Sequence, residues 1–226
     1  MERTAWLKQK RVEAEQRMDK LWSPIYDDNW GAIIAPSHRT MMLKFLSLCA
    51  PGGLLLDGAC GTGKYWPMIL ERDLTIYGID QSRGMLARAR KKHPSVQADR
   101  VGLQEMNFTA VFDAATCMDA MEYIFPEDWL LVLENFYRAL KSGTYFYFTV
   151  EIASPEAIAA DFAKARGMGL PVVYGESAWE PGYHYYPEIE RVREWLHQAH
   201  FVPVDEATGD SYHHFLVQKP MEKSDR

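Results

Sequence analysis

The sequence of 226 residues predicts an α/β fold, in which a doubly wound, mostly parallel sheet of seven strands carries helices on both faces. Two observations support this prediction. Short apolar strand segments alternate with helical segments over the middle of the chain, which is typical of a parallel sheet buried on both faces. Near the C-terminus, two β-prone segments are separated only by Thr208-Gly209-Asp210, which predicts an antiparallel pair that closes the sheet.

The N-terminal 50 residues (1–50) precede the alternating pattern, and we expect them to form a helical cap or lid. Residues 3–22 have the apolar spacing of an amphipathic helix. Ser37 is the predicted N-cap of a second helix. Residues 51–226 form the main domain of this prediction.

The strands of the parallel part follow from short apolar or β-branched runs bounded by turn residues. They are predicted at 54–57, 75–79, 96–101, 112–118 and 144–151. The helices between them are predicted at 65–71, 82–92 and 128–140. In sheets of this type ligands bind beyond the carboxyl ends of the strands, so residues directly after the strands are candidates for a site.

The last third of the chain is predicted to add two helices and the closing strand pair. The helices are expected at 155–166 and 188–200, and the strands at 201–207 and 212–219. Residues 167–187 are predicted to form a loop rich in Tyr and Trp. Aromatic, glycine-punctuated loops of this length are usually either functional or disordered, and we expect 152–187 to be a substrate-side insertion.

Composition and charge narrow the class of protein. The net charge of -6 disfavours a nucleic-acid partner, which usually requires a basic face. The three cysteines lack Cys-x-x-Cys spacing and predict neither a disulfide framework nor a structural zinc site. No apolar run approaches the ~18 residues of a membrane span, and the charged N-terminus is unlike a signal peptide. We therefore expect a cytoplasmic monomer or homodimer with no metal, membrane or nucleic-acid partner.

The segment GACGTGKY, at 58–65, allows two interpretations. With Lys64 it is close to a phosphate-binding loop, and the protein would then be a P-loop-like nucleotide-triphosphate hydrolase. That loop requires a Ser or Thr after its Lys to bind magnesium, whereas this chain has Tyr65. With Asp57 in front, the pattern D-x-A-x-G-x-G is instead typical of loops that bind S-adenosylmethionine.

The second interpretation also accounts for Asp80. Small residues in the loop allow the backbone to approach the methionine part of the cofactor closely. Asp80 ends the next predicted strand, 23 positions after Asp57, and its two oxygens can accept both ribose hydroxyls. The alternative role for Asp80 is to cap the helix that begins near Ser82.

Together, LLLDGACGTGKY and IYGIDQSRGMLARARKK resemble the first two motifs of the class I S-adenosylmethionine-dependent methyltransferases, whose fold is Rossmann-like. Weaker likenesses extend over the third to fifth strands and the closing pair. The resemblance implies S-adenosylmethionine as cofactor, with Asp80 on its ribose, Met85 against its adenine and Gln104 where the family often has an acid. With the aromatic residues expected to shield the sulfonium, the predicted cofactor-binding residues are Tyr26, Trp30, Asp57, Ala59, Cys60, Gly61, Gly63, Asp80, Gln81, Ser82, Met85, Gly102, Leu103, Gln104, Cys117, Met118 and Tyr123.

Two signatures of nucleic-acid methylation are absent from the sequence. No Asn/Asp-Pro-Pro-aromatic sequence follows the fourth strand, and the chain has no Pro-Cys pair. These absences and the acidic net charge favour a small-molecule acceptor. A non-catalytic protein that binds S-adenosylmethionine is the alternative.

The expected chemistry is an in-line displacement, which requires alignment of acceptor, methyl group and sulfur, and a base only where the acceptor must lose a proton. Asp119 and Glu122, at the exit of the fourth strand, are the candidate catalytic groups, with His184 on a segment that could cover the site. Two acids beside the methyl group would orient a cationic amine, which favours N-methylation over O-methylation. Aromatic side chains of the cofactor set are expected to shield the sulfonium through cation–π contacts.

Overall fold

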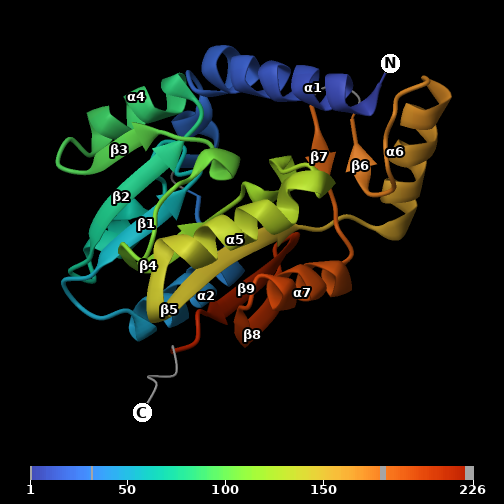
Figure 1. The fold of residues 1–226 in the computed structure, drawn as a ribbon. Helices are drawn as coiled ribbons and strands as arrows, with labels where there is room; N and C mark the ends of the chain where they lie inside the picture. Colours follow the sequence, from blue (N-terminus) through green and yellow to red (C-terminus); the bar gives the residue numbers. More distant parts are fainter. Residues whose placement is uncertain (1, 32, 179–181, 222–226) are drawn as a thin grey trace.

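The computed structural model describes residues 2–31, 33–178 and 182–221 of the chain. The strands of its main sheet are β1 (Leu54–Gly58), β2 (Thr75–Asp80), β3 (Gln97–Arg100), β4 (Phe112–Cys117), β5 (Leu140–Glu151), β8 (Val202–Gly209) and β9 (Tyr212–Gln218). They are ordered β3-β2-β1-β4-β5-β9-β8; the first five run parallel, and β9 runs antiparallel to both of its neighbours. The predicted seven-stranded fold with its antiparallel C-terminal pair is confirmed (Figure 1).

Helices cover both faces of the sheet. The α-helices are α1 (Arg3–Arg17), α2 (Pro36–Leu48), α3 (Trp66–Leu70), α4 (Arg83–Lys92), α5 (Trp129–Ala139), α6 (Pro155–Gly167) and α7 (Ile189–Gln198). Side chains of α5 and α7 belong to one buried cluster, and those of α2, α3 and α4 belong to another. Figure 1 shows α5 and α7 in front of the sheet and α2 behind it, while α1 lies across the top of the molecule.

Short helical turns complete the connections between these elements. They are the π-helical segments η1 (Met18–Trp22) and η2 (Asp27–Gly31) and the 3-10 turns η3 (Leu103–Glu105), η4 (Met121–Tyr123) and η5 (Pro126–Asp128). The helix predicted over residues 3–22 is present as α1 followed directly by η1. Its last turn has π rather than α geometry, and it leads into the aromatic η2 segment.

The predicted N-cap of the second helix was wrong. Helix α2 begins at Pro36, after the N-cap Ala35, because the fixed φ of proline suits the first helical position. Ser37 instead joins the helix to the turn between β8 and β9, since its backbone N–H donates to Asp210 Oδ2 at 2.8 Å. The predicted cap at Ser82 is confirmed, because its hydroxyl accepts the N–H of Met85 at 3.1 Å.

The prediction of a loop over residues 167–187 missed a small hairpin. Strands β6 (Glu176–Ser177) and β7 (His184–Tyr185) pair antiparallel within this segment. Strands of two residues are too short to produce an alternating apolar pattern, which explains why the sequence did not reveal them. In Figure 1 this hairpin lies beside α6, below the start of α1.

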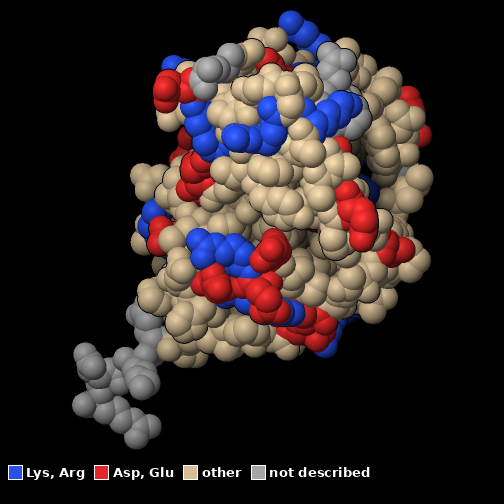
Figure 2. Space-filling view, turned by 90° about the vertical axis from the view of Figure 1, so that its right-hand side faces the viewer, with Lys and Arg blue, Asp and Glu red and all other residues tan. Residues whose placement is uncertain are grey.

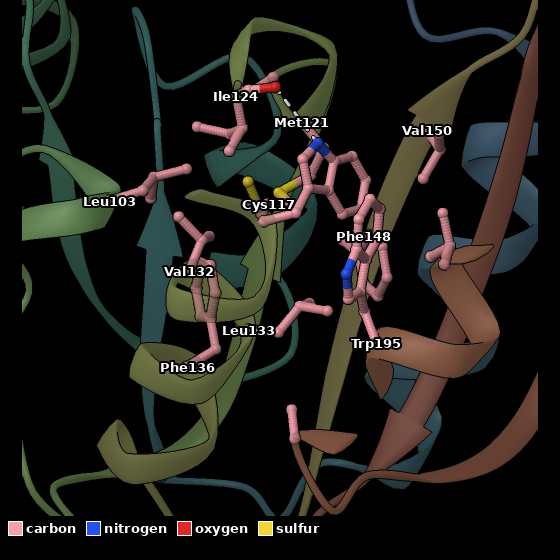
Figure 3. Close-up of a cluster of buried hydrophobic side chains, with 14 of the residues drawn as sticks. Leu103, Cys117, Met121, Ile124, Val132, Leu133, Phe136, Phe148, Val150 and Trp195 are labelled. Atoms are coloured by element: carbon pink, nitrogen blue, oxygen red, sulfur yellow. Dashed lines mark hydrogen bonds between the residues drawn. The ribbon is translucent and has the colours of Figure 1, made fainter. Parts of the chain in front are cut away.

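The apolar core under α5 fixes the position of the turn η4. The indole rings of Trp129 and Trp195 stack with centroids 5.2 Å apart. Trp129 Nε1 donates to the carbonyl of Ile124 at 3.2 Å, and Met121 is fully buried beneath (Figure 3). Burial of such large side chains contributes about 1.5–3 kcal/mol each. The turn that carries Glu122 is therefore held rigidly at the end of β4.

Charges of both signs alternate over part of the surface. In the lower half of the face that carries α6 and α7, acidic side chains lie next to basic ones (Figure 2). One such ion pair joins Arg193 on α7 to Glu206 on β8 at 2.6 Å. That half of the face does not present the continuous basic surface typical of nucleic-acid-binding proteins.

Candidate active site

A strained loop follows β1 at the carboxyl edge of the sheet. Ala59, Gly61 and Gly63 have φ values of 53°, 55° and 74°, so the loop enters the left-handed region three times. Glycine adopts this region freely, whereas the Cβ of Ala59 costs about 1 kcal/mol there. The N–H of Cys60 donates to the carbonyl of Ile79 at 2.9 Å and ties the loop to the end of β2.

A cavity of about 620 Å³ opens beside this loop. Its lining comes from the N-terminal elements α1, η1, η2 and α2, from the carboxyl ends of β1 to β5 or the segments that follow them, and from β7 and the start of β9. Its size lies within the ~300–1,000 Å³ typical of small-molecule sites. The cavity therefore brings together the carboxyl ends of five parallel strands under the N-terminal helix.

Nearly all predicted site residues line this cavity, and three do not. The cavity is lined by the predicted residues Tyr26, Trp30, Asp57, Ala59, Cys60, Gly61, Asp80, Gln81, Met85, Gly102, Leu103, Gln104, Met118, Asp119, Glu122, Tyr123 and His184. Gly63 faces the ring of Trp66, with no room for a Cβ. The hydroxyl of Ser82 caps α4, and Cys117 is fully buried in the core.

The carboxylate of Asp57 is engaged within the protein. Its two oxygens accept hydrogen bonds from Trp66 Nε1 at 2.7 Å and Thr116 Oγ1 at 2.8 Å. Burial raises the pKa of Asp57 to about 6, although both hydrogen bonds lower it. Asp57 thus joins the end of β1 to α3 and β4, a role that the sequence motif did not reveal.

Asp80 has the geometry of a receptor for two hydroxyl groups. Its Oδ2 accepts the N–H of Gly61 at 2.9 Å, and its Oδ1 accepts the N–H of Ser82 at 2.7 Å. Each oxygen retains a further lone pair for a ligand donor. Burial raises the pKa of Asp80 to about 6, against the effect of the two backbone hydrogen bonds.

Comparison with known proteins gives one consistent result. A family described as a methyltransferase domain matches residues 55–143. Phosphatidylethanolamine N-methyltransferase from Cereibacter sphaeroides is 28% identical over 72% of this chain and 67% of its own length. Demethylmenaquinone methyltransferase from Oceanobacillus iheyensis is 28% identical over 57% of this chain and 59% of its own length. This chain thus spans between about half and two thirds of the length of most curated relatives it matches.

A solved structure agrees with this match. The S-adenosylmethionine-dependent methyltransferase from Mesorhizobium loti superposes with a TM-score of 0.66 at 19% identity, over 81% of this chain and 97% of that one. Residues 55–143 are a methyltransferase domain, and the fold around them is that of the class I S-adenosylmethionine-dependent methyltransferases. The resemblance inferred from the sequence is confirmed, and S-adenosylmethionine is the cofactor of this methyltransferase.

The cavity of the methyltransferase fits this cofactor. Asp80 offers two acceptor atoms to ribose hydroxyls, and the adenine would lie among apolar groups such as Met85 and Leu103. The loop around Gly61 has open space where a Cβ would stand, which leaves room for the methionine part. Gln104, the expected contact for adenine, lines the cavity, while its amide donates to Asp128 at 3.3 Å.

Asp119, a predicted catalytic group, is held by other residues of the methyltransferase. Its carboxylate lies 2.8 Å from His38 Nε2, accepts the Tyr65 hydroxyl at 2.9 Å, and is 3.4 Å from Lys64 Nζ. Burial raises the pKa of Asp119, but His38, Lys64 and Tyr65 outweigh this and hold it below its ordinary value. Asp119 also has a φ of 53°, a strained conformation for a non-glycine residue. A carboxylate engaged in this way is a poor proton acceptor.

Glu122, the second predicted catalytic acid, differs from Asp119 in its hydrogen bonding and in the direction of its pKa shift. It is 2% exposed, and its Oε2 has no hydrogen-bond partner in the described part of the chain. Burial, followed by the charges of Glu151 and Asp119, raises the pKa of Glu122 well above its ordinary value. His184 Nδ1 lies 3.0 Å from Glu151 Oε2, so the predicted residues Glu122 and His184 meet around Glu151. A pair of carboxylates, the buried Glu122 and the half-buried Glu151, thus lines one end of the cavity.

Aromatic rings surround the acid pair and the cavity mouth. Trp30 contacts Trp22 and Tyr26, with ring centroids 5.3 and 5.5 Å apart. Tyr123 meets His184 edge to face at 4.9 Å. Burial and nearby acids raise the pKa values of Tyr26 and Tyr123, so both phenols stay neutral at physiological pH.

Several residues of the site were not identified from the sequence. Four residues that line the cavity were not among the predicted site residues, namely His38, Tyr65, Glu151 and Tyr212. Glu151 ends β5 at the carboxyl edge, and this position at the end of a β-prone run could have identified it. Among residues 2–31, 33–178 and 182–221, no group of His, Cys, Asp and Glu side chains is arranged to hold a metal ion. No helix in the same ranges is long and apolar enough to cross a membrane.

Proposed function

We propose that this methyltransferase acts on a nitrogen or oxygen of a small-molecule acceptor, and that the preferred atom is an amine nitrogen. The observation that supports an amine is the carboxylate pair formed by the buried Glu122 and the half-buried Glu151. A buried carboxylate ionises readily only beside a cation, and a protonated amine supplies that cation. One relative is named for N-methylation of an amine-bearing lipid, while another is named for a quinone acceptor.

The proposed chemistry assigns proton transfer to one acid and orientation of the acceptor to two others. S-adenosylmethionine supplies an electrophilic methyl group, and the electron pair of the broken C–S bond remains on its sulfur. Glu122 accepts the proton that an ammonium group must lose, so that the nitrogen lone pair is free to form the new N–C bond. Asp119 keeps its charge, and with Glu151 and His184 it orients the acceptor.

In this proposal, residues 1–50 act as the lid of the cavity over the domain of residues 51–226. Arg3 of α1 is 2.8 Å from the buried Glu176 of β6, within the proposed substrate-side insertion at 152–187. At the other end, Asp19 accepts the N–H of Gly84 at 3.0 Å. A lid bound at both ends excludes water, which strengthens the electrostatic interactions inside.

A matched pair of acceptors tests the proposed atom. The protein is incubated with S-adenosylmethionine and either 2-phenylethylamine or 2-phenylethanol, and S-adenosylhomocysteine release is measured by mass spectrometry. The amine is expected to be methylated and the alcohol is not. Methylation of the alcohol alone would show that the acid pair does not select an amine.

A matched pair of variants tests the role of Glu122. Replacement of a general base typically costs about 10²–10⁴-fold in rate, and Glu122→Gln is expected to lower kcat on the amine by that amount. Glu134→Gln changes the same charge at an exposed position of α5 and should leave kcat unchanged. Full turnover by Glu122→Gln would rule out Glu122 as the proton acceptor.

The compartment and assembly of the protein remain part of this proposal. Cys49, Cys60 and Cys117 are free thiols, which agrees with a reducing compartment such as the cytoplasm. A monomer and a homodimer are both consistent with the small-molecule function, and light scattering in solution distinguishes them.

A further inference from the structure

We propose that the acceptor is an amine that also carries an anionic group, and that Arg17 binds this group at the mouth of the cavity. This inference rests on the amine methylation proposed above. It adds a second binding group, Arg17, for the part of the acceptor that carries a negative charge.

The first support comes from the cations that line the cavity. In the described part of the chain, four Lys and Arg side chains line it, and three of them have a carboxylate partner. The three pairs are Lys10–Glu13, Arg11–Asp128 and Lys64–Asp119, at 2.8, 2.8 and 3.4 Å. Arg17 is the fourth cation, and it leaves a positive charge on this wall.

The side chain of Arg17 has no hydrogen bond or ion pair with any residue that the structure describes. Glu13, one helical turn earlier, is its acidic neighbour on α1. Both oxygens of Glu13 already accept hydrogen bonds, from Gln9 Nε2 at 2.7 Å and from Lys10 Nζ at 2.8 Å. The guanidinium of Arg17 therefore keeps its five N–H donors for a ligand or for water.

The position of Arg17 places these donors at the rim of the cavity. Arg17 also lines an adjoining hollow, together with Gly182. A Cβ at Gly182 would overlap Arg17 Nη1, so the glycine makes room for the guanidinium. Gly182 precedes His184 by two residues, or about 7 Å of extended chain, and His184 contacts Glu151. The segment that contacts Arg17 through Gly182 thus also reaches the acid pair through His184.

With carboxylates at one end and Arg17 at the other, the cavity would select an acceptor that carries both a positive and a negative group. A guanidinium binds a carboxylate or a phosphate through two parallel N–H donors, which fixes the orientation of the group as well as its charge. An ammonium group held by Glu122 and Glu151 and an anion held by Arg17 would align the acceptor along the cavity. An amine with a neutral end would bind at one point only.

Matched acceptor pairs test the inference. The probes are β-alanine against n-propylamine and O-phosphoethanolamine against ethanolamine, and kcat/KM is measured for each. The anionic member of each pair is expected to be better by at least about tenfold, as for one charge-assisted hydrogen bond. Arg17→Gln should abolish this preference, and Gly182→Ala should reduce it by displacing the guanidinium. Lys8→Gln removes the same charge from an exposed position of α1 and should leave the preference for the anionic acceptor unchanged.

The outcomes separate this inference from the proposed function. If amines are methylated with no preference for an anionic group, the role of Arg17 is wrong and amine methylation stands. If Arg17→Gln weakens S-adenosylhomocysteine binding and leaves the acceptor preference intact, Arg17 serves the cofactor and the inference is wrong. If S-adenosylhomocysteine binds but no amine is methylated, the proposed function fails and this inference fails with it.

Discussion

Replacement of Asp80 by Asn tests the cofactor end of the cavity. Each oxygen of Asp80 accepts one backbone N–H, from Gly61 at 2.9 Å and from Ser82 at 2.7 Å. In Asp80→Asn one oxygen becomes an NH₂ group, which faces a backbone donor instead of accepting from it. The variant also loses the anionic acceptor for a ribose hydroxyl.

The magnitude follows from the strength of hydrogen bonds to charged groups. Loss of one such bond to the ribose costs about 1.5–3 kcal/mol, and thus raises the Kd of S-adenosylhomocysteine by roughly 10- to 150-fold. The unpaired backbone N–H costs a further 1–3 kcal/mol or so of folding stability. Since each kcal/mol shifts the Tm of a domain of this size by about 2–4 °C, the Tm falls by several degrees.

Isothermal titration with S-adenosylhomocysteine measures the effect on affinity, and thermal unfolding measures the effect on stability. Asp113→Asn is the matched control, because Asp113 also accepts a backbone N–H, from Leu54 at 3.0 Å, but lies at the amino end of the strands. The control should lose stability and keep its affinity. An unchanged Kd in Asp80→Asn, or an equal rise in Asp113→Asn, would refute the assignment of Asp80 to the ribose.

Three further predictions concern pH, stability and the lid. Because burial raises the pKa of Asp80 to about 6, the carboxylate is ionised at pH 7.5 and mostly protonated at pH 5. The Kd of S-adenosylhomocysteine should therefore rise as the pH of the titration falls through about 6, and a flat profile would contradict this. Trp66→Phe removes one donor from the buried Asp57 and should lower the Tm by about 3–12 °C in thermal unfolding; an unchanged Tm would show that the Trp66 bond is dispensable. Arg3→Met leaves Glu176 buried without its cation and should speed S-adenosylhomocysteine release in stopped-flow experiments, whereas equal release rates would argue against α1 as a lid.

The cofactor end of the site could be predicted from the sequence because its signal is local. The glycine-rich loop, Asp80 and the cap at Ser82 lie within a stretch of about one strand–helix–strand unit, and each has a residue type that the backbone geometry requires. The closing strand pair was predictable for the same reason, since a short turn separates two β-prone runs.

The acceptor end could not be predicted with the same detail, because its contacts join distant segments. His38 and Asp119 are 81 positions apart, and only the fold brings them to 2.8 Å. The sequence therefore marked Asp119 as a possible base, whereas the structure surrounds it with partners that keep it ionised. Glu151 and His184 meet through β5 and a hairpin whose strands are too short to be visible in a sequence pattern.

The most direct test of the account is the position of a transferred methyl group in an acceptor that offers both atoms. Tyramine carries an amine and a phenol, and S-adenosylmethionine with a deuterated methyl group marks the product for tandem mass spectrometry. The acid pair of Glu122 and Glu151 predicts that the label is found on the amine nitrogen. Label on the phenolic oxygen alone would contradict the assignment of this cavity to amine methylation.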